Sequence, residues 1–118
     1  MHRKFTYNGA TITLHRTRNA DELDAELLTS LLMGDGDRTV RDWHRARRYA
    51  DMLVSVDAVD EPLRALLPPV DAPADALRAG FEAWLNEDGL YRAWKTAYAQ
   101  VNAPVGDQDT SPVADPKD

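Results

Sequence analysis

The sequence predicts a small α+β domain that is mostly α-helical, with an N-terminal β-hairpin, about four helices and a disordered acidic C-terminal tail. Three observations support this class. An alternating segment surrounds an Asn-Gly pair near the start, apolar residues recur at helical spacing through the middle, and the end is polar and rich in proline and aspartate. The chain of 118 residues has room for one compact domain, which we expect over residues 1–103.

Residues 3–16 predict the hairpin. Asn8 and Gly9 tolerate the positive φ angles of a two-residue type I′ turn, and polar and apolar residues alternate on both sides of them. This register places the larger apolar side chains Phe5, Tyr7, Ile12 and Leu14 on one face. Since a lone hairpin is marginally stable in water, this face must lie on helices or join strands from another chain.

Two helices are expected next, over residues 20–33 and 39–56. Capping boxes at Asn19 with Glu22 and at Thr39 with Asp42 mark their starts. Their apolar stripes are Leu23, Leu27, Leu28, Leu31 and Leu32 in the first, and Val40, Trp43, Ala46, Ala50, Leu53 and Val54 in the second. The segment GDGD, residues 34–37, lacks the spacing of a phosphate or calcium loop and predicts a plain loop between these helices.

Residues 57–73 hold four prolines, which exclude a long regular helix and predict a surface connector. Within it Leu63, Leu66 and Leu67 are expected to form one turn. Two further helices are predicted over residues 73–86 and 88–101. Their inward stripes are Leu77, Phe81, Trp84 and Leu85, then Leu90, Tyr91, Trp94, Ala97, Tyr98 and Val101. Residues 104–118 have too little apolar content to offset the entropy of ordering and predict a disordered tail.

Composition excludes several classes of function. No cysteine is present, so thiol catalysis and thiolate metal sites are excluded, and no apolar run is long enough to cross a membrane. The N-terminus lacks the apolar block of a secretory signal, so we expect the protein to stay in the cell that makes it. The net charge of −6 argues against a general nucleic-acid binder.

No arrangement of residues predicts an enzyme. The histidines, His2, His15 and His44, lie on different elements without a second histidine or a carboxylate at helical ligand spacing, so no metal is expected. No serine lies in a nucleophile turn, and no cofactor motif is present. We therefore expect a non-enzymatic protein without a cofactor.

Two sets of residues are candidates for contacts with a partner. Arg41, Arg45 and Arg48 share one helical face and suit an acidic partner, although the pattern is more typical of a solvated face paired with Asp42, Asp51 or carboxylates of the C-terminal half. Trp84 and Trp94 are typical of core positions, and Trp94 is also a candidate for contact with a partner, together with Tyr91, Tyr98 and the hairpin residues Phe5, Tyr7, Ile12 and Leu14. Tyr91 and Tyr98 share a face that we expect to be half exposed. If both this face and the hairpin face are uncovered, the protein exposes more apolar surface than a monomer normally does, which indicates self-assembly.

The order of hairpin, two helices, proline-broken connector and two aromatic helices resembles the tail assembly chaperones of long-tailed bacteriophages and prophages. The resembling residues are Phe81, Trp84, Leu85, Leu90, Tyr91, Arg92, Ala93, Trp94, Ala97, Val101, Asn102, Ala103 and Pro104, together with the segment VSVDAVDEPLRALLPP at 54–69. In layout the resemblance covers residues 3–104.

The resemblance implies a non-enzymatic factor in the host cytoplasm that coats the tape measure protein until tail tube protein polymerises around it. Members of that family commonly self-associate, and many also exist as a longer frameshifted form. A helical surface that covers the apolar stripes of a tape measure rod would use helix-in-groove packing. Two rival functions remain: a structural virion component such as a connector or tail-completion protein, and a small DNA-binding regulator that uses Arg41, Arg45 and Arg48.

Overall fold

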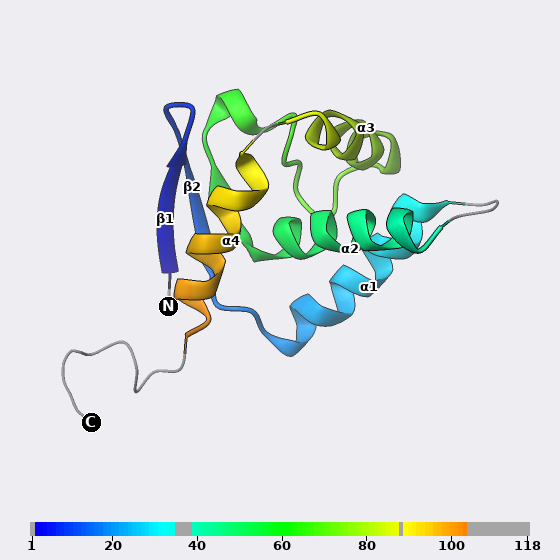
Figure 1. The fold of residues 1–118 in the computed structure, drawn as a ribbon, viewed down its shortest axis with the longest axis horizontal. Coiled ribbons are helices and arrows are strands. Elements are labelled where there is room, and N and C mark those ends of the chain that lie inside the picture. The colour runs from blue at the N-terminus through cyan, green and yellow to red at the C-terminus, as the bar shows by residue number, and fades with distance from the viewer. Residues whose placement is uncertain (1, 35–38, 88, 104–118) are drawn as a thin grey trace.

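The computed structural model describes residues 2–34, 39–87 and 89–103, and its ribbon is shown in Figure 1. Its elements are β1 (His2–Tyr7), β2 (Ala10–His15), α1 (Asn19–Met33), α2 (Val40–Ser55), β3 (Val56–Val59), the 3₁₀ turn η1 (Glu61–Leu63), α3 (Ala74–Leu85) and α4 (Leu90–Val101). The predicted α+β, mostly helical class is therefore confirmed. The predicted tail, 104–118, and most of the GDGD loop lie outside the described residues.

The hairpin forms in the register that the sequence predicts. Phe5 pairs with Ile12 and Tyr7 with Ala10, while Asn8 and Gly9 take positive φ angles of 50° and 82° at the turn. These left-handed angles are the ones that a type I′ turn requires, which explains why Asn and Gly occupy it.

The sheet has a third strand that the sequence analysis did not predict. β3 pairs antiparallel with β2, so the strand order is β1-β2-β3 and the expected surface connector begins with a strand. The register passes from Thr13 opposite Ala58 to Leu14 opposite Val56, which leaves Asp57 as the extra residue of a β-bulge. Bulges turn side chains away from the regular alternation, and the Asp57 carboxylate is directed at His15, as described below.

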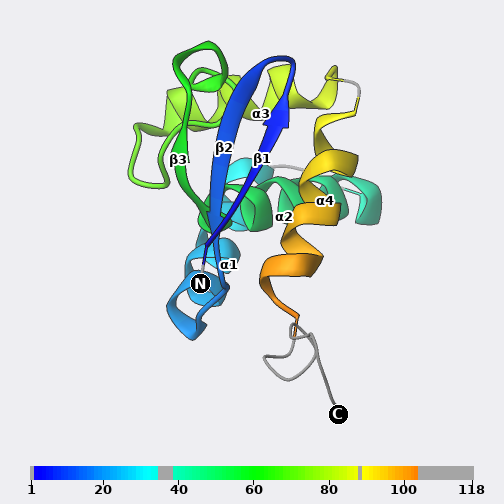
Figure 2. The same cartoon turned by 90° about the vertical axis from the view of Figure 1, so that its left-hand side faces the viewer.

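The helices lie on one side of the sheet. α1 and α2 fold back on each other behind the sheet, α3 lies near their far end, and α4 runs beside β1 and β2 (Figure 1 and Figure 2). The core is built from buried residues of β2, the connector and all four helices, and its largest fully buried side chains include Tyr49, Ile12, Leu14, Met52, Leu77, Leu90 and Val101. The leucines of the connector, Leu63, Leu66 and Leu67, also close this core, so the connector is not a mere surface loop.

The helix starts follow capping chemistry, with one correction. At α2 the predicted box is present: Asp42 N–H donates to Thr39 Oγ1 and Thr39 N–H donates to Asp42 Oδ2, both at 3.1 Å. At α1 the cap lies one residue earlier than predicted, because Arg18 is the N-cap and its N–H donates to Asp21 Oδ2 at 2.9 Å. Asp21 is buried, and its carboxylate also lies within hydrogen-bond distance of His15 and of the Arg18 side chain. Asp21 therefore supplies the capping carboxylate that was expected from Glu22.

Candidate functional site

The hairpin residues predicted to bind a partner lie mostly in the core. Ile12 and Leu14 have no exposed surface, because the helices cover that face of the sheet. Phe5 and Tyr7 are half-buried at its edge, and the Tyr7 hydroxyl donates to Glu87 Oε1 at 2.7 Å. Of the two outcomes expected for this face, packing on helices is the one observed, and Ile12 and Leu14 are corrected from partner contacts to core residues.

The aromatic residues of α4 divide in the same way. Trp94 is buried, and its indole N–H donates to Ser55 Oγ at 2.8 Å, so it too is a core residue and not a partner contact. Tyr91 and Tyr98 are half-buried beside it, as their spacing predicts, with ring centroids 5.6 and 4.6 Å from that of Trp94. Only the outer edges of these tyrosines are available to a partner.

The three arginines of the predicted basic face differ in their surroundings. Arg48 Nη1 pairs with Asp51 Oδ2 at 3.5 Å, in agreement with the solvated-face reading. Arg41 and Arg45 are exposed, and the described part of the chain shows no ion pair for either of them. These two guanidiniums remain available to an acidic partner.

A surface that the sequence analysis did not predict lies on the outer side of α1 and α2. Leu23 and Leu27, expected in the core, are 63% and 71% exposed, and Val40 and Trp43 are 85% and 49% exposed. The buried stripe of α1 is instead Ala25, Leu28, Thr29 and Leu32. We call the group of Leu23, Leu27, Val40 and Trp43 the outer helical surface.

The outer helical surface consists of two pairs of exposed apolar residues, one pair on each helix. Leu23 and Leu27 are one helical turn apart on α1, and Val40 and Trp43 share a face of α2. A groove of about 370 Å³ joins the two helices, with Trp43 and Arg47 on one side and Glu26, Ser30 and Met33 on the other. Apolar residues gathered on the exposed side of two adjacent helices are typical of a protein-binding surface.

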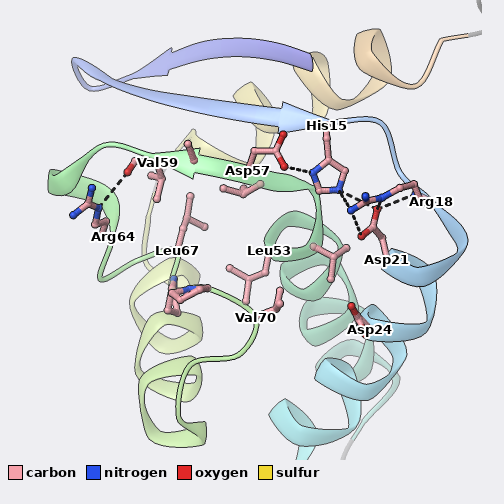
Figure 3. Close-up of a pocket in the computed structure, with 15 residues that line it drawn as sticks. His15, Arg18, Asp21, Asp24, Leu53, Asp57, Val59, Arg64, Leu67 and Val70 are labelled. Carbon is pink, nitrogen blue, oxygen red and sulfur yellow. Dashed lines mark hydrogen bonds and ion pairs between the residues drawn. The ribbon is translucent and has the colours of Figure 1, made fainter. Parts of the chain in front are cut away.

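A second feature is a pocket of about 700 Å³ beside β3, shown in Figure 3. At one end His15 lies between two carboxylates: Nδ1 is 2.7 Å from Asp57 Oδ1 and Nε2 is 2.9 Å from Asp21 Oδ2. His2 Nε2 is 2.7 Å from the other oxygen of Asp57, and Arg18 Nε donates to Asp21 at 3.3 Å. This group of five residues ties β1, β2, β3 and the start of α1 together.

The geometry of this group indicates a structural role. Both ring nitrogens of His15 lie within hydrogen-bond distance of carboxylates of this chain, so the ring is held between β3 and α1. Burial disfavours the charge of Asp21, but the hydrogen bonds from the Arg18 side chain and backbone and from His15 outweigh it and hold the pKa of Asp21 below its ordinary value. Among the described residues no group of three or more side chains is arranged to hold a metal ion.

A pH prediction follows from Asp21. Because its folded pKa is depressed, its contribution to stability is complete above the ordinary value of 3.8 and is lost as the pH falls through the lower folded value. We expect Asp21→Asn to lower the free energy of unfolding at pH 7 by about 1–2 kcal/mol, since hydrogen bonds to a charged group are lost. Urea unfolding between pH 7 and 2.5 measures both effects.

The matched control for this prediction is Asp24→Asn on the exposed side of the same helix, which we expect to change stability by less than about 0.5 kcal/mol. Equal stability of Asp21→Asn and the native chain at pH 7 would show that the group does not fasten the sheet to α1.

The sequence analysis missed this group for a definite reason. His15 and Asp57 are 42 residues apart, and they meet only because β3 pairs with β2 and bulges at Asp57. A search of ligand spacing along single helices does not find contacts made across a sheet. His44, in contrast, lies exposed on α2 and does not belong to this group.

Comparison of the chain with protein families, with curated proteins and with solved structures found no significant match. No helix in the described residues has the length and apolar character needed to span a membrane.

Proposed function

We propose that this protein is a non-enzymatic phage tail assembly chaperone that binds the tape measure protein in the host cytoplasm and promotes assembly of tail tube protein. The proposal is supported by the order of elements, which resembles the layout expected of that family, and by the aromatic segment that forms α3 and α4. The observation that carries it is the outer helical surface, where Leu23, Leu27, Val40 and Trp43 expose apolar side chains in the described part of the chain.

This surface suits a helical partner. α1 is apolar on two sides, since Leu28 and Leu32 face the core while Leu23 and Leu27 face solvent. A helix that exposes leucines at i and i+4 beside a groove can accept the apolar stripe of another helix by ridge-and-groove packing. A tape measure rod presents such stripes along its length, so several copies of the chaperone can bind it in succession.

Two exposed arginines on another side of α2 favour a partner with carboxylates. Arg41 and Arg45 show no ion pair in the described residues, and Arg45 faces α3, whereas Trp43 faces the groove between α1 and α2. Exposed guanidinium groups increase the rate of association with an acidic partner and set its orientation more than they increase affinity. In this proposal they contact acidic side chains of the tape measure protein, and the half-buried Tyr91 and Tyr98 contact a neighbouring copy of the chaperone.

Co-expression with the large helical protein encoded downstream tests the proposal. The native chain is expected to co-elute with that protein as a multi-copy complex in light-scattering chromatography, whereas the partner alone is insoluble. The double variant Leu23→Asp, Leu27→Asp should fold normally and lose at least about tenfold in recovered complex, because two carboxylates would be buried unpaired in the interface.

Ala83→Asp is the matched control, because Ala83 is exposed on α3 and lines neither the groove beside Trp43 nor the pocket that contains Arg45, so this variant should not affect recovery. Full recovery of the complex with the double variant would exclude the outer helical surface as the binding site. An insoluble partner and a monomeric native chain would argue against the chaperone function, and stoichiometric presence of the chain in purified virions would favour a structural component.

A further inference from the structure

The open edge of β3 forms one wall of the pocket beside it. β3 has β2 on one side only, and the described residues provide no strand on its other side. All four of its residues, Val56–Val59, line the pocket. Since successive residues of a strand point to opposite faces, a pocket that touches every one of them runs along the edge of the strand and not over one face. Figure 3 shows the pocket on the side of β3 opposite β2.

The hydrogen bonds of β3 show which backbone groups face this pocket. Asp60 N–H donates to Thr11 O at 3.0 Å, so the backbone of Asp60 faces β2. In an antiparallel pair the direction alternates along the strand, so the N–H and C=O of Val59 point away from β2. The Arg64 side chain agrees with this assignment, because its Nε donates to Val59 O at 3.4 Å from outside the sheet. This long, exposed contact occupies the position that an N–H of an added strand would take.

The rest of the pocket is apolar with charged ends. Leu53 and Leu67 lie on its inner side with Val70 opposite, while Arg64 is at one end and Asp24 at the other (Figure 3). Its volume, about 700 Å³, is within the usual range of binding clefts. The pocket is lined by three carboxylates and two guanidiniums, and Asp24 is the one carboxylate for which the described residues show no partner.

We propose that this pocket binds an extended peptide segment of another protein, which adds to the free edge of β3 as a fourth strand. The Val59 N–H and C=O bond the peptide backbone, its apolar side chains lie on Leu53 and Leu67, and a lysine or arginine of the peptide pairs with Asp24. An extended backbone matches the spacing of donors and acceptors along a strand edge, which a compact metabolite does not.

Charge selects a separate protein over the chain's own tail as the occupant. Residues 104–118 hold four aspartates and one lysine, so the tail has the same sign of charge as Asp24. The site is distinct from the outer helical surface, and the proposal does not depend on the identity of the partner that binds there.

The test uses the full chain and the synthetic peptide Ac-KVTVTVT-NH2, which is extended, alternates apolar with polar residues and carries one lysine. Titration followed by amide chemical shifts is expected to move the signals of residues 56–59, 67 and 70 and to protect the Val59 amide from hydrogen exchange. Val59→Pro should weaken binding at least about tenfold, because proline removes the outward N–H and obstructs the edge. The ladder to β2 does not use that N–H, so the fold should persist.

Two controls separate the loss of the backbone hydrogen bonds from a general effect on the fold. Val59→Thr retains the N–H and should bind within about twofold of the native chain. A peptide N-methylated at the alternate amides that face β3 should not bind the native protein, which tests the same hydrogen bonds without any change to the fold.

Unchanged affinity with Val59→Pro, or binding of the N-methylated peptide, would overturn strand addition. Protection of the Val59 amide in the free full-length protein would also overturn the proposal, since it would show that the tail or a second copy already occupies the edge. Equal affinity for a peptide with glutamate in place of lysine would exclude the pairing with Asp24.

Discussion

Replacing Trp94 with alanine is expected to lower the free energy of unfolding by about 3–5 kcal/mol, the cost of removing a large aromatic side chain from a core. Trp94 is 3% exposed and contacts the rings of Tyr91 and Tyr98. Its indole also donates to Ser55 Oγ, which is fully buried, so the substitution leaves both a cavity and an unsatisfied acceptor. Since the free energy of unfolding of a small domain is only about 5–15 kcal/mol, this variant should be partly unfolded at 37 °C.

Urea unfolding followed by far-ultraviolet circular dichroism measures this loss. Trp43→Ala is the matched control, because Trp43 is 49% exposed on the outer helical surface and its removal should cost less than about 1 kcal/mol. Similar losses for the two variants would contradict the assignment of Trp94 to the core and Trp43 to the surface.

Gly80→Ala is expected to destabilise the protein by about 2–4 kcal/mol, although alanine is the better helix former. Gly80 is buried on α3, where an added Cβ would overlap the Tyr49 hydroxyl and come within 2.9 Å of Pro68 Cδ. Tyr49 cannot move aside, because it is fully buried and its hydroxyl donates to Leu66 O at 2.6 Å. Burial raises the pKa of Tyr49 above its ordinary value of 10.0, so this donor stays protonated at neutral pH.

A double-variant cycle separates this clash from other causes. Tyr49→Phe alone should cost about 1–3 kcal/mol, because Leu66 O loses its partner in the core. The pair Gly80→Ala, Tyr49→Phe should be less destabilised than the sum of the single variants, since the clashing oxygen is absent. Additive losses would show that Gly80 is required for another reason. Ala79→Gly, on the exposed side of α3, measures the propensity term of about 1 kcal/mol alone.

Local signals in the sequence predicted the fold class and the elements well. The turn at Asn8 and Gly9 specified the hairpin register, and each helix begins and ends within two residues of its predicted range. These signals depend on turn chemistry and helical periodicity, which act over a few residues. β3 was missed because its four residues follow a helix directly, precede prolines and pair with a strand some 42–47 residues earlier, so nothing local marks them.

The candidate sites were predicted less well, because periodicity shows that a face is apolar without showing what covers it. The Ile12 and Leu14 face of the hairpin was correctly recognised as apolar, but the helices of the same chain cover it. Leu23 and Leu27 follow the same helical spacing as the core leucines Leu28 and Leu32, yet they lie on the opposite side of α1. Only the packing of α1 on α2 distinguishes the two pairs, and that packing is a property of the tertiary structure.

The contacts that join the two ends of the domain determine when its fold can be completed during translation. Thr17 donates through its N–H to Asn102 Oδ1 and through its hydroxyl to Tyr98, across 85 and 81 residues of sequence. The α1–α2 pair can form early from neighbouring residues, but α4 reaches β1 and β2 only after nearly the whole domain has been made. During translation the side of the hairpin that α4 covers is therefore exposed on the nascent chain. Completion of the fold becomes a late event, and until then the apolar side of the hairpin is open to association with other chains.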